Sequence, residues 1–178
     1  YPLIAKPRGG SASRGLVILM GPADWVRVPT NEPMVVQPYL FPAAWQDDPA
    51  TLRATLEYLE GTRQPLSREI HAMQVVIDAQ GDILGFYDGL TIMRSGIPVE
   101  SRPVQDARIR GACEHLIGAL VSCGLRITCN AQGLDTREGF FFFEVNPRFA
   151  GSTHLRALLG HNEAEAAVRY YGLGQDGE

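Results

Sequence analysis

The sequence has 178 residues, of which 45% are hydrophobic and 20% charged, and its formal net charge is −4. This length and composition are typical of a globular protein that can bury a core without a disulfide or a structural metal. Acidic and basic residues are mixed along the chain, which argues against a nucleic-acid partner, and the longest apolar run is too short for a membrane span. We find no signal peptide, and because the first residues already have a strand pattern we expect the chain to begin inside a larger protein.

The first third of the chain predicts short strands joined by glycine-rich and proline-rich links. Strands are predicted over residues 2–7, 16–20 and 34–40, and helices over 22–24 and 49–59. The third strand contains Pro38, which should remove one ladder hydrogen bond. The second helix follows from leucines at helical spacing inside a segment rich in Pro, Asp and Gln, residues 42–67.

The rest of the chain predicts hairpins around one long helix. Strands are predicted over 69–78 and 83–93 with a turn at 79–82, then as a pair meeting near 135–139, and helices over 104–123, 152–159 and 162–171. The long helix carries an apolar stripe of Ile109, Cys113, Leu116, Ile117 and Leu120, and Gly124 ends it. Hairpins flanking one helix predict an α+β fold with an antiparallel sheet.

The cysteines and histidines indicate a cellular compartment rather than a catalytic or metal-binding role. The three cysteines form no Cys-x-x-Cys pair, and the four histidines lack zinc-ligand spacing. Cys113 falls in a helical pattern and Cys129 in a strand pattern, which favours buried thiols in a reducing compartment. We therefore expect a cytoplasmic protein.

Polar side chains alternate along the strand pair that ends the sheet. Side chains of a strand alternate between two faces, so Gln132 shares a face with Thr128 and Asn130. By the same alternation Glu144, Asn146 and Arg148 share one face, and Phe141, Phe143 and Val145 share the opposite, core-facing one. A turn centred near residue 138 would set Gln132 roughly opposite Glu144, about 5 Å away between Cβ atoms.

This patch has the donor types of a magnesium site. Glu144 supplies a carboxylate, and Gln132 and Asn146 supply neutral amide oxygens, which suit Mg²⁺ together with substrate phosphates. Arg148 offers a forked donor for a phosphate or a carboxylate. A solvated polar face is equally common on antiparallel sheets, so the pattern alone does not separate the two interpretations.

The same residues carry a family resemblance. Asn130-Ala131-Gln132, followed by the run Phe143-Glu144-Val145-Asn146-Pro147-Arg148-Phe149, resembles the metal-binding segment of ATP-grasp enzymes, especially the large-subunit type of carbamoyl-phosphate synthase. The resemblance implies that Gln132, Glu144 and Asn146 bind Mg²⁺ or Mn²⁺. It implies a catalytic contact from Arg148 to phosphate or an acyl phosphate. The run 151–162 is also similar to relatives of this type.

The N-terminal end agrees with the resemblance. Lys6, at the end of the first strand, resembles the family's nucleotide lysine, with a binding and catalytic role near the α and β phosphates. The following loop, with Gly10, Ser11 and Ser13, resembles the loop that closes over the phosphates. Glycines let backbone N–H groups approach an anion. The loop is not a Walker P-loop, because Leu16 and Val17 stand where Lys and Ser/Thr belong.

Residues 35–40 resemble the hinge strand that reads adenine. Gln37 is followed by Pro38, where the family often has Glu, so the resemblance favours backbone contacts from Tyr39 and Leu40. Further along, Glu69 resembles an acidic position that contacts ribose, although a strand surface charge is the plain alternative. Arg94 matches a polar position near the phosphates. Residues 42–67 are longer than the family's usual link and resemble a family-specific insertion.

The resemblance implies an ATP-grasp fold fragment with sheets and flanking helices in two lobes. Residues 1–40 would form part of the small lobe, 41–68 an insertion or linker with a helix, and 69–178 the C-terminal lobe with the metal site. The family's N-terminal part is missing. We therefore expect the chain to work with the rest of its own polypeptide or to associate with a second copy.

The implied function is that of a Mg²⁺-ATP-dependent ligase. A small-molecule carboxylate attacks the γ-phosphate, and an amine, ammonia or a thiol displaces phosphate from the acyl phosphate, most simply forming a C–N bond. Two other classes stay open. One is a regulatory nucleotide-binding module without ligase activity, and the other is a non-catalytic scaffold fragment.

Overall fold

The computed structural model describes residues 1–9, 14–66, 69–94 and 97–172, which form two compact units. The first unit comprises Tyr1–Arg68 with Arg94–Ile97 and Asp135–Gly139. The second comprises Glu69–Met93, Pro98–Leu134 and Phe140–Glu178. In the described part of the chain, no helix combines the length and the apolar character that a bilayer span requires.

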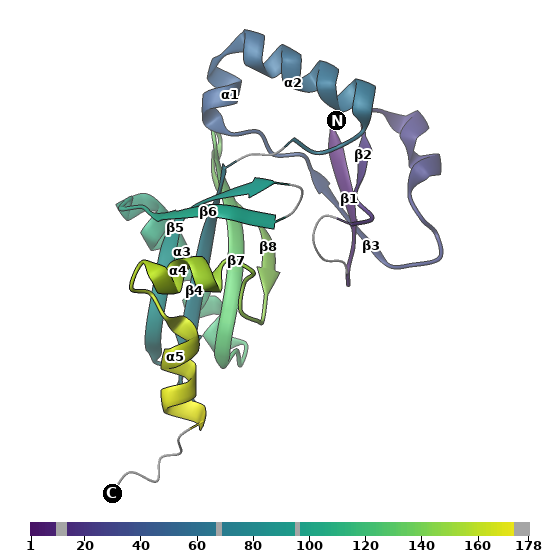
Figure 1. The fold of residues 1–178 in the computed structure, drawn as a ribbon. Coiled ribbons are helices and arrows are strands. Elements are labelled where there is room, and N and C mark those ends of the chain that lie inside the picture. The colour runs from purple at the N-terminus through teal and green to yellow at the C-terminus, as the bar shows by residue number, and fades with distance from the viewer. Residues whose placement is uncertain (10–13, 67–68, 95–96, 173–178) are drawn as a thin grey trace, which may run out of the picture. The chain divides into compact units, whose positions relative to one another are not determined.

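The first unit is built on a three-stranded antiparallel sheet in the order β2-β1-β3 (Figure 1). Its elements are β1 (Leu3–Pro7), β2 (Val17–Leu19), the 3₁₀ helix η1 (Pro22–Arg27), β3 (Met34–Pro38), α1 (Ala43–Asp47) and α2 (Pro49–Thr62). Its buried core joins Ile18, Tyr39 and Leu59. Leu59 comes from α2, so the segment expected as an insertion contains the predicted helix and contributes to the core of this unit.

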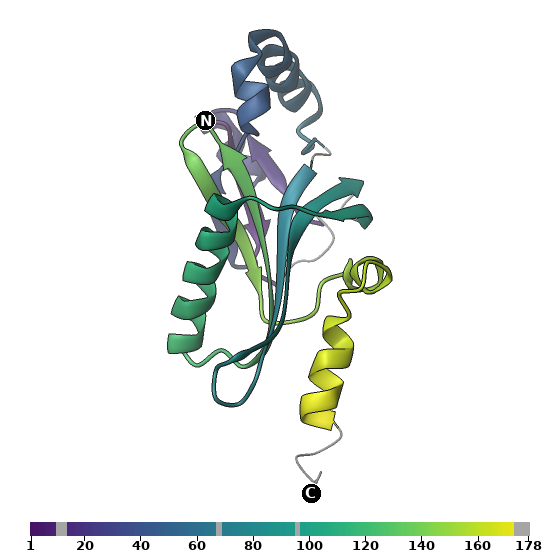
Figure 2. The ribbon, with the colours of Figure 1, turned by 90° about the vertical axis from the view of Figure 1, so that its left-hand side faces the viewer.

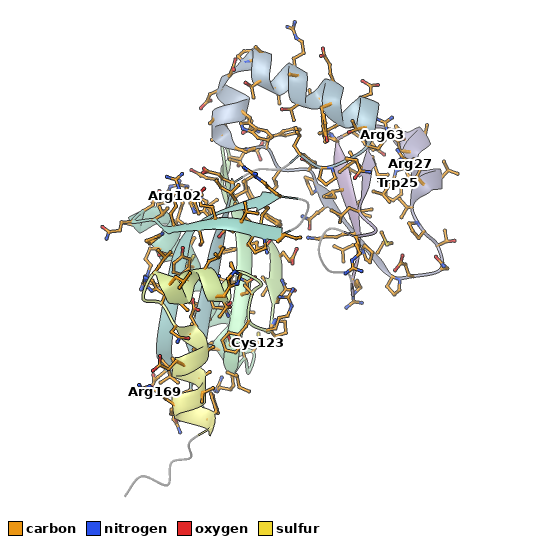
Figure 3. All side chains as sticks on the ribbon, in the orientation of Figure 1. Trp25, Arg27, Arg63, Arg102, Cys123 and Arg169 are labelled. Atoms are coloured by element: carbon orange, nitrogen blue, oxygen red, sulfur yellow. The ribbon has the colours of Figure 1, made fainter. Side chains whose placement is uncertain are left out.

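A carboxylate ties η1 to its neighbours. Asp24 accepts hydrogen bonds from the backbone N–H of Met20 at 2.7 Å and Gly21 at 3.3 Å. Arg63 lies 3.4 Å from the same carboxylate, and Arg27 lies 3.7 Å from it (Figure 3). The Met20 amide is the main cause that lowers the pKa of Asp24, and the two guanidinium groups act in the same direction.

The second unit is built on a five-stranded sheet in the order β6-β5-β4-β7-β8. Its elements are β4 (Glu69–Ile77), β5 (Ile83–Arg94), β6 (Ile97–Pro103), α3 (Ala107–Ser122), β7 (Ile127–Thr136), β8 (Gly139–Asn146), α4 (Thr153–Leu158), α5 (Glu163–Ala167) and the π-helical turn η2 (Val168–Gly172). Helix α3 lies along one face of this sheet, and α4 and α5 lie on the other side (Figure 2).

The predicted stripe of α3 forms the core of this unit. Ile109, Cys113 and Ile117 are buried against Met73, Val75 and Ile77 of β4 and Cys129 and Ala131 of β7. Leu116 and Leu120 pack at the border of the same core. Asp106 caps the start of the helix, because its side chain accepts from the backbone N–H groups of Arg108 and Ile109, and the helix ends before Gly124, which has φ +91°.

The turn between β4 and β5 is closed by one side chain. Asp78 Oδ1 accepts from the backbone N–H groups of Gln80, Gly81 and Asp82 at 2.7–2.8 Å. Gly81 has φ +104°, and a Cβ there would lie 2.9 Å from Val121 of α3. The predicted turn at 79–82 is therefore confirmed, and its glycine is required both by the backbone and by the helix beside it.

The structure corrects the predicted faces of β8. Phe140 and Phe142 pack against the core, whereas Phe141 is 42% exposed and Val145 41% exposed, so the prediction that Phe141, Phe143 and Val145 form the core face was wrong. The turn lies at residues 137–138, and β8 begins at Gly139. The missing side chain of Gly133 leaves room for the ring of Phe140, which lies where a Cβ would be.

Candidate functional site

The end of β8 brings together two of the three predicted metal ligands. Asn146 Nδ2 donates to Glu144 Oε1 at 2.8 Å, and both residues are half-buried. This bond uses neither Asn146 Oδ1 nor Glu144 Oε2, so each side chain keeps an oxygen of the kind that Mg²⁺ prefers. Within the described ranges, no group of three or more His, Cys, Asp or Glu side chains could hold a metal. Of the two oxygens that this bond does not use, Glu144 Oε2 belongs to a carboxylate and Asn146 Oδ1 to an amide.

The third predicted ligand lies on the neighbouring strand. Gln132 is half-buried on β7, where it pairs with Ala72 of β4. Strand β7 lies between β4 and β8 in the sheet. The position of Gln132 opposite Glu144 depends on the register between β7 and β8 and stays a prediction.

Arg148 follows β8 at the surface of the second unit. Its backbone N–H donates to Asn146 O at 2.8 Å, and its guanidinium Nη1 donates to Phe149 O at 3.0 Å. The side chain is exposed. The predicted catalytic arginine is thus joined by its main chain to a predicted metal ligand.

A buried polar network under this segment was not predicted from the sequence. Arg156 and Glu163 form an ion pair with 2.6 Å between Arg156 Nε and Glu163 Oε1, and Arg156 Nη2 donates to Gln74 Oε1 at 3.0 Å. Gln74 and Arg156 are fully buried, and Glu163 nearly so. A sequence signal existed at Gln74 alone, because a polar residue interrupts the apolar run of β4.

In the first unit, the register of the sheet places two predicted nucleotide residues together. Lys6 of β1 pairs with Val35 of β3, and Ile4 pairs with Gln37. Directly opposed residues share a face, and residues two apart on a strand do so as well. Lys6 and Gln37 therefore project from the same face of the three-stranded sheet.

Tyr39 and Leu40, the two residues predicted to contact adenine through their backbone, follow β3. Tyr39 is buried, its backbone N–H donates to Pro2 O at 3.1 Å, and its hydroxyl accepts from Leu66 N at 3.3 Å. Leu40 is half-buried beside it. The Tyr39 amide already has this partner, and a backbone contact of either residue with adenine stays a prediction.

The other residues predicted to contact the nucleotide come from separate segments of the chain. Glu69 of β4 forms an exposed ion pair with Arg102 of β6 at 3.0 Å, and Arg102 is labelled in Figure 3. Arg94 is exposed at the end of β5. The loop residues Gly10, Ser11 and Ser13 lie outside the described residues. Neither ribose nor phosphate contact is tested for these positions.

The chain is similar in structure to solved proteins. No family model matches the sequence, and no curated protein matches it. Solved structures do match. An N5-carboxyaminoimidazole synthetase from Staphylococcus aureus, complexed with ADP, is 17% identical with a TM-score of 0.63, over 89% of this chain and 37% of that one. A biotin carboxylase from Campylobacter jejuni, in a β,γ-ATP complex, is 17% identical with a TM-score of 0.66, over 96% of this chain and 36% of that one.

The chain has the ATP-grasp fold.

A third neighbour with this fold is an L-amino acid ligase from Bacillus licheniformis, 14% identical with a TM-score of 0.52, which matches 86% of this chain and 33% of its own. The chain thus spans about a third of the length of these solved chains. The ATP-grasp fragment has the α+β architecture, the antiparallel sheets and the flanking helices expected from the sequence.

Proposed function

We propose that the chain is the C-terminal part of the ATP-grasp domain of a ligase that uses ATP to activate a carboxylate. The observation that carries the proposal is the Glu144–Asn146 pair at the end of β8, in a fold shared with a nucleotide-bound synthetase and a nucleotide-bound carboxylase. The Asn-x-Gln and Glu-x-Asn-Pro-Arg motifs favour the carbamoyl-phosphate synthase type within this group.

Nucleotide contacts are proposed for Lys6, Leu40 and seven further residues. Lys6 would pair with phosphate oxygens, as a point charge with three donors, and Leu40 would read adenine through its backbone. The supporting contacts are proposed for Gly10, Ser11, Ser13, Gln37, Tyr39, Glu69 and Arg94. Of these, Gln37 has the firmest support, because the register of the sheet puts it on the face of Lys6.

Glu144, Asn146 and Gln132 would hold Mg²⁺ through one carboxylate and two amide oxygens. The bound ion would neutralise charge on the transferring phosphoryl group. Arg148 would bind the phosphate or the acyl phosphate with its forked donors, and its exposure leaves it accessible to a substrate. In this mechanism the substrate carboxylate attacks the γ-phosphate, ADP leaves, and an amine, ammonia or a thiol then displaces phosphate.

The test needs the complete protein, because the chain covers little more than a third of its neighbours. Calorimetry would measure the binding of ATP with and without Mg²⁺. ADP release would then be measured against a panel of carboxylates that includes bicarbonate, with ammonia, amines or thiols as acceptors. We expect Mg²⁺-dependent binding and ADP release that requires one carboxylate. Binding without release on any carboxylate would instead indicate a regulatory module, and absence of binding would indicate a scaffold.

A further inference from the structure

Gln74 occupies the centre of the sheet and bonds the segment that follows β8. Its Oε1 accepts from the backbone N–H of Ala150 at 3.0 Å and from Arg156 Nη2 at 3.0 Å. Its Nε2 faces Thr128 Oγ1 at 2.6 Å, Cys129 O at 3.1 Å and, most distantly, Arg148 O at 3.5 Å. One side chain therefore bonds the peptide N–H that follows Phe149 and lies 3.5 Å from the carbonyl oxygen that precedes it.

The orientation of this amide is fixed by its partners. Both groups at Oε1 are donors, and the two carbonyl oxygens at Nε2 are acceptors, so a flipped amide would oppose donor to donor and acceptor to acceptor. Thr128 Oγ1 donates to Val75 O at 2.8 Å, which leaves its lone pairs for Gln74. The carboxamide therefore has a single orientation in which all of its hydrogen bonds are satisfied.

Arg156 supports the amide from the side opposite the sheet. Its guanidinium is fully buried and bonds Glu163, Ser152 and Thr153 as well as Gln74. The ring of Tyr87 lies 5.2 Å from Arg156 Cζ. Charge-assisted hydrogen bonds are stronger than neutral ones, and burial of the whole network strengthens them further. The network therefore joins β4 and β7 rigidly to α4 and α5.

We infer that Gln74 is a positioning residue for Arg148: it fixes the backbone from which the Arg148 guanidinium projects. The inference rests on the catalytic role proposed for Arg148. Strand β4 is the middle strand of the sheet, so the position of Arg148 is set by the best-supported part of the unit. If Gln74 only stabilised the fold, it would still bond this segment, but its loss would not lower the reaction rate through Arg148.

Two substitutions separate the functions of the amide. Gln74→Glu keeps acceptors for Ala150 and Arg156, but its ionised form places an oxygen against the carbonyl groups of Cys129 and Arg148. Protonation of the introduced carboxyl restores a donor, so the defect should shrink as the pH falls. Gln74→Met removes both kinds of bond with nearly the same volume. Gln105→Met is the matched control, since Gln105 is exposed in the same unit.

Hydrogen exchange on the complete protein tests the geometric part. We expect Gln74→Met and Gln74→Glu to speed exchange of the Ala150 amide at least tenfold, while amides of the α3 core keep wild-type rates. The Gln105→Met control should leave Ala150 unchanged. Unchanged exchange at Ala150 in both Gln74 variants would overturn the inference, whatever the protein catalyses.

Turnover tests the catalytic part. Displacement of a catalytic group by about 1 Å can cost up to about 100-fold in rate, so Gln74→Met should lower kcat by about 10- to 100-fold with little change in the KM for ATP. In an Arg148→Met background the same substitution should have no further effect, because Gln74 acts through Arg148. Multiplicative losses would overturn the inference while leaving the proposed function intact. A wild-type protein without carboxylate-dependent turnover would overturn both.

Discussion

At the scale of single residues, the metal-binding role proposed for Glu144 can be tested almost separately from folding. Glu144→Gln keeps an oxygen that can accept from Asn146 Nδ2, so we expect the free energy of unfolding to change by less than about 1 kcal/mol. Loss of the charged ligand should lower Mg²⁺-dependent ADP release by about 100-fold or more, because a carboxylate binds the ion far better than an amide. Steady-state kinetics and urea unfolding of the complete protein measure the two effects.

The control for this variant is Glu57→Gln, an exposed change on α2. It should leave both ADP release and unfolding at wild-type values. Wild-type release in Glu144→Gln would mean that the carboxylate at the end of β8 binds no catalytic metal.

Lys6 is the only lysine in the sequence, which makes its proposed contact with phosphate directly testable. Lys6→Met should weaken ATP by about 10- to 100-fold, since a charge-assisted hydrogen bond contributes about 1.5–3 kcal/mol. Adenosine should bind equally well to both proteins. Calorimetry with the two ligands measures the difference, and Arg53→Met on the exposed face of α2 is the control. An equal loss for ATP and adenosine would show that Lys6 acts through the fold.

The buried thiols predict a loss of stability at alkaline pH. Burial raises the pKa of Cys113 from 9.0 to about 12, and that of Cys129 from 9.0 to about 11. At a pH between 9.0 and the raised pKa of each thiol, the unfolded chain loses the thiol proton while the folded chain keeps it. The free energy of unfolding should therefore be unaffected below pH 9 and fall above it, by at most about 1.4 kcal/mol per pH unit for each thiol.

Urea unfolding at pH 8 and pH 10 measures this loss. A variant with Cys113→Ala and Cys129→Ala should lose less stability over the same interval, since other groups also titrate there. Cys123 is exposed after α3 and serves as the control position (Figure 3). Equal losses in the wild type and in the double variant would contradict the assignment.

At the scale of elements, the start of α3 depends on one side chain. Asp106 Oδ1 accepts from Arg108 N at 2.9 Å and from Ile109 N at 3.2 Å. Asp106→Ala leaves these donors without the cap and should lower the free energy of unfolding by about 1 kcal/mol. Asp106→Asn keeps the acceptor and should stay close to the wild type. Denaturant midpoints of the two variants measure the difference, and equal midpoints would show that the cap contributes nothing.

Most helices and strands could be predicted from the sequence because their patterns are local. The α3 stripe, its glycine stop and the Asp78 turn all depend on residues close together in the chain. Strand β6 was not predicted, because Pro98 and Pro103 interrupt any strand pattern. It lies at the edge of the sheet, where a proline costs fewer ladder bonds.

The face of β8 that is buried and the contacts of Gln74 could not be predicted from local patterns, because they depend on packing between residues far apart in the sequence. Four consecutive phenylalanines, 140–143, fit either face of a strand, and the choice follows from the space above Gly133. Gln74 and Arg156 are 82 positions apart, so no local pattern joins them. The contact between Glu144 and Asn146 was accessible to sequence reasoning because the two residues lie within three positions on one strand, whereas their binding of a metal stays a prediction.

At the scale of the whole molecule, the residues predicted to contact nucleotide and metal are not all in one unit. Lys6 and Gln37 belong to the first unit, whereas Glu144 and Arg148 belong to the second. The chain also spans little more than a third of its structural neighbours. The identity of the proposed carboxylate substrate and of its acceptor therefore could not be predicted from these residues.

Because the chain covers only part of the length of its structural neighbours, a prediction can be made for residues 1–178 purified alone. Both units expose apolar side chains, including Val26 at 88% and Leu158 at 84%. Exposed apolar surface favours association, either with a second copy or with the rest of the polypeptide. An adenine pocket also loses contacts and pre-organisation together when part of its wall is missing. We therefore expect the isolated chain to self-associate and to bind Mg²⁺-ATP at least tenfold more weakly than the complete protein.

Light scattering and nucleotide titration of both proteins measure these two properties, with the complete protein as the reference at equal concentration. Association should fall in a Val26→Ser/Leu158→Ser variant if exposed apolar side chains cause it, because each substitution removes apolar area without touching the proposed site. A monomer that binds Mg²⁺-ATP as tightly as the complete protein would contradict the prediction. The residues that hold the nucleotide would then all lie within 1–178, and the substrate carboxylate alone would depend on the remainder.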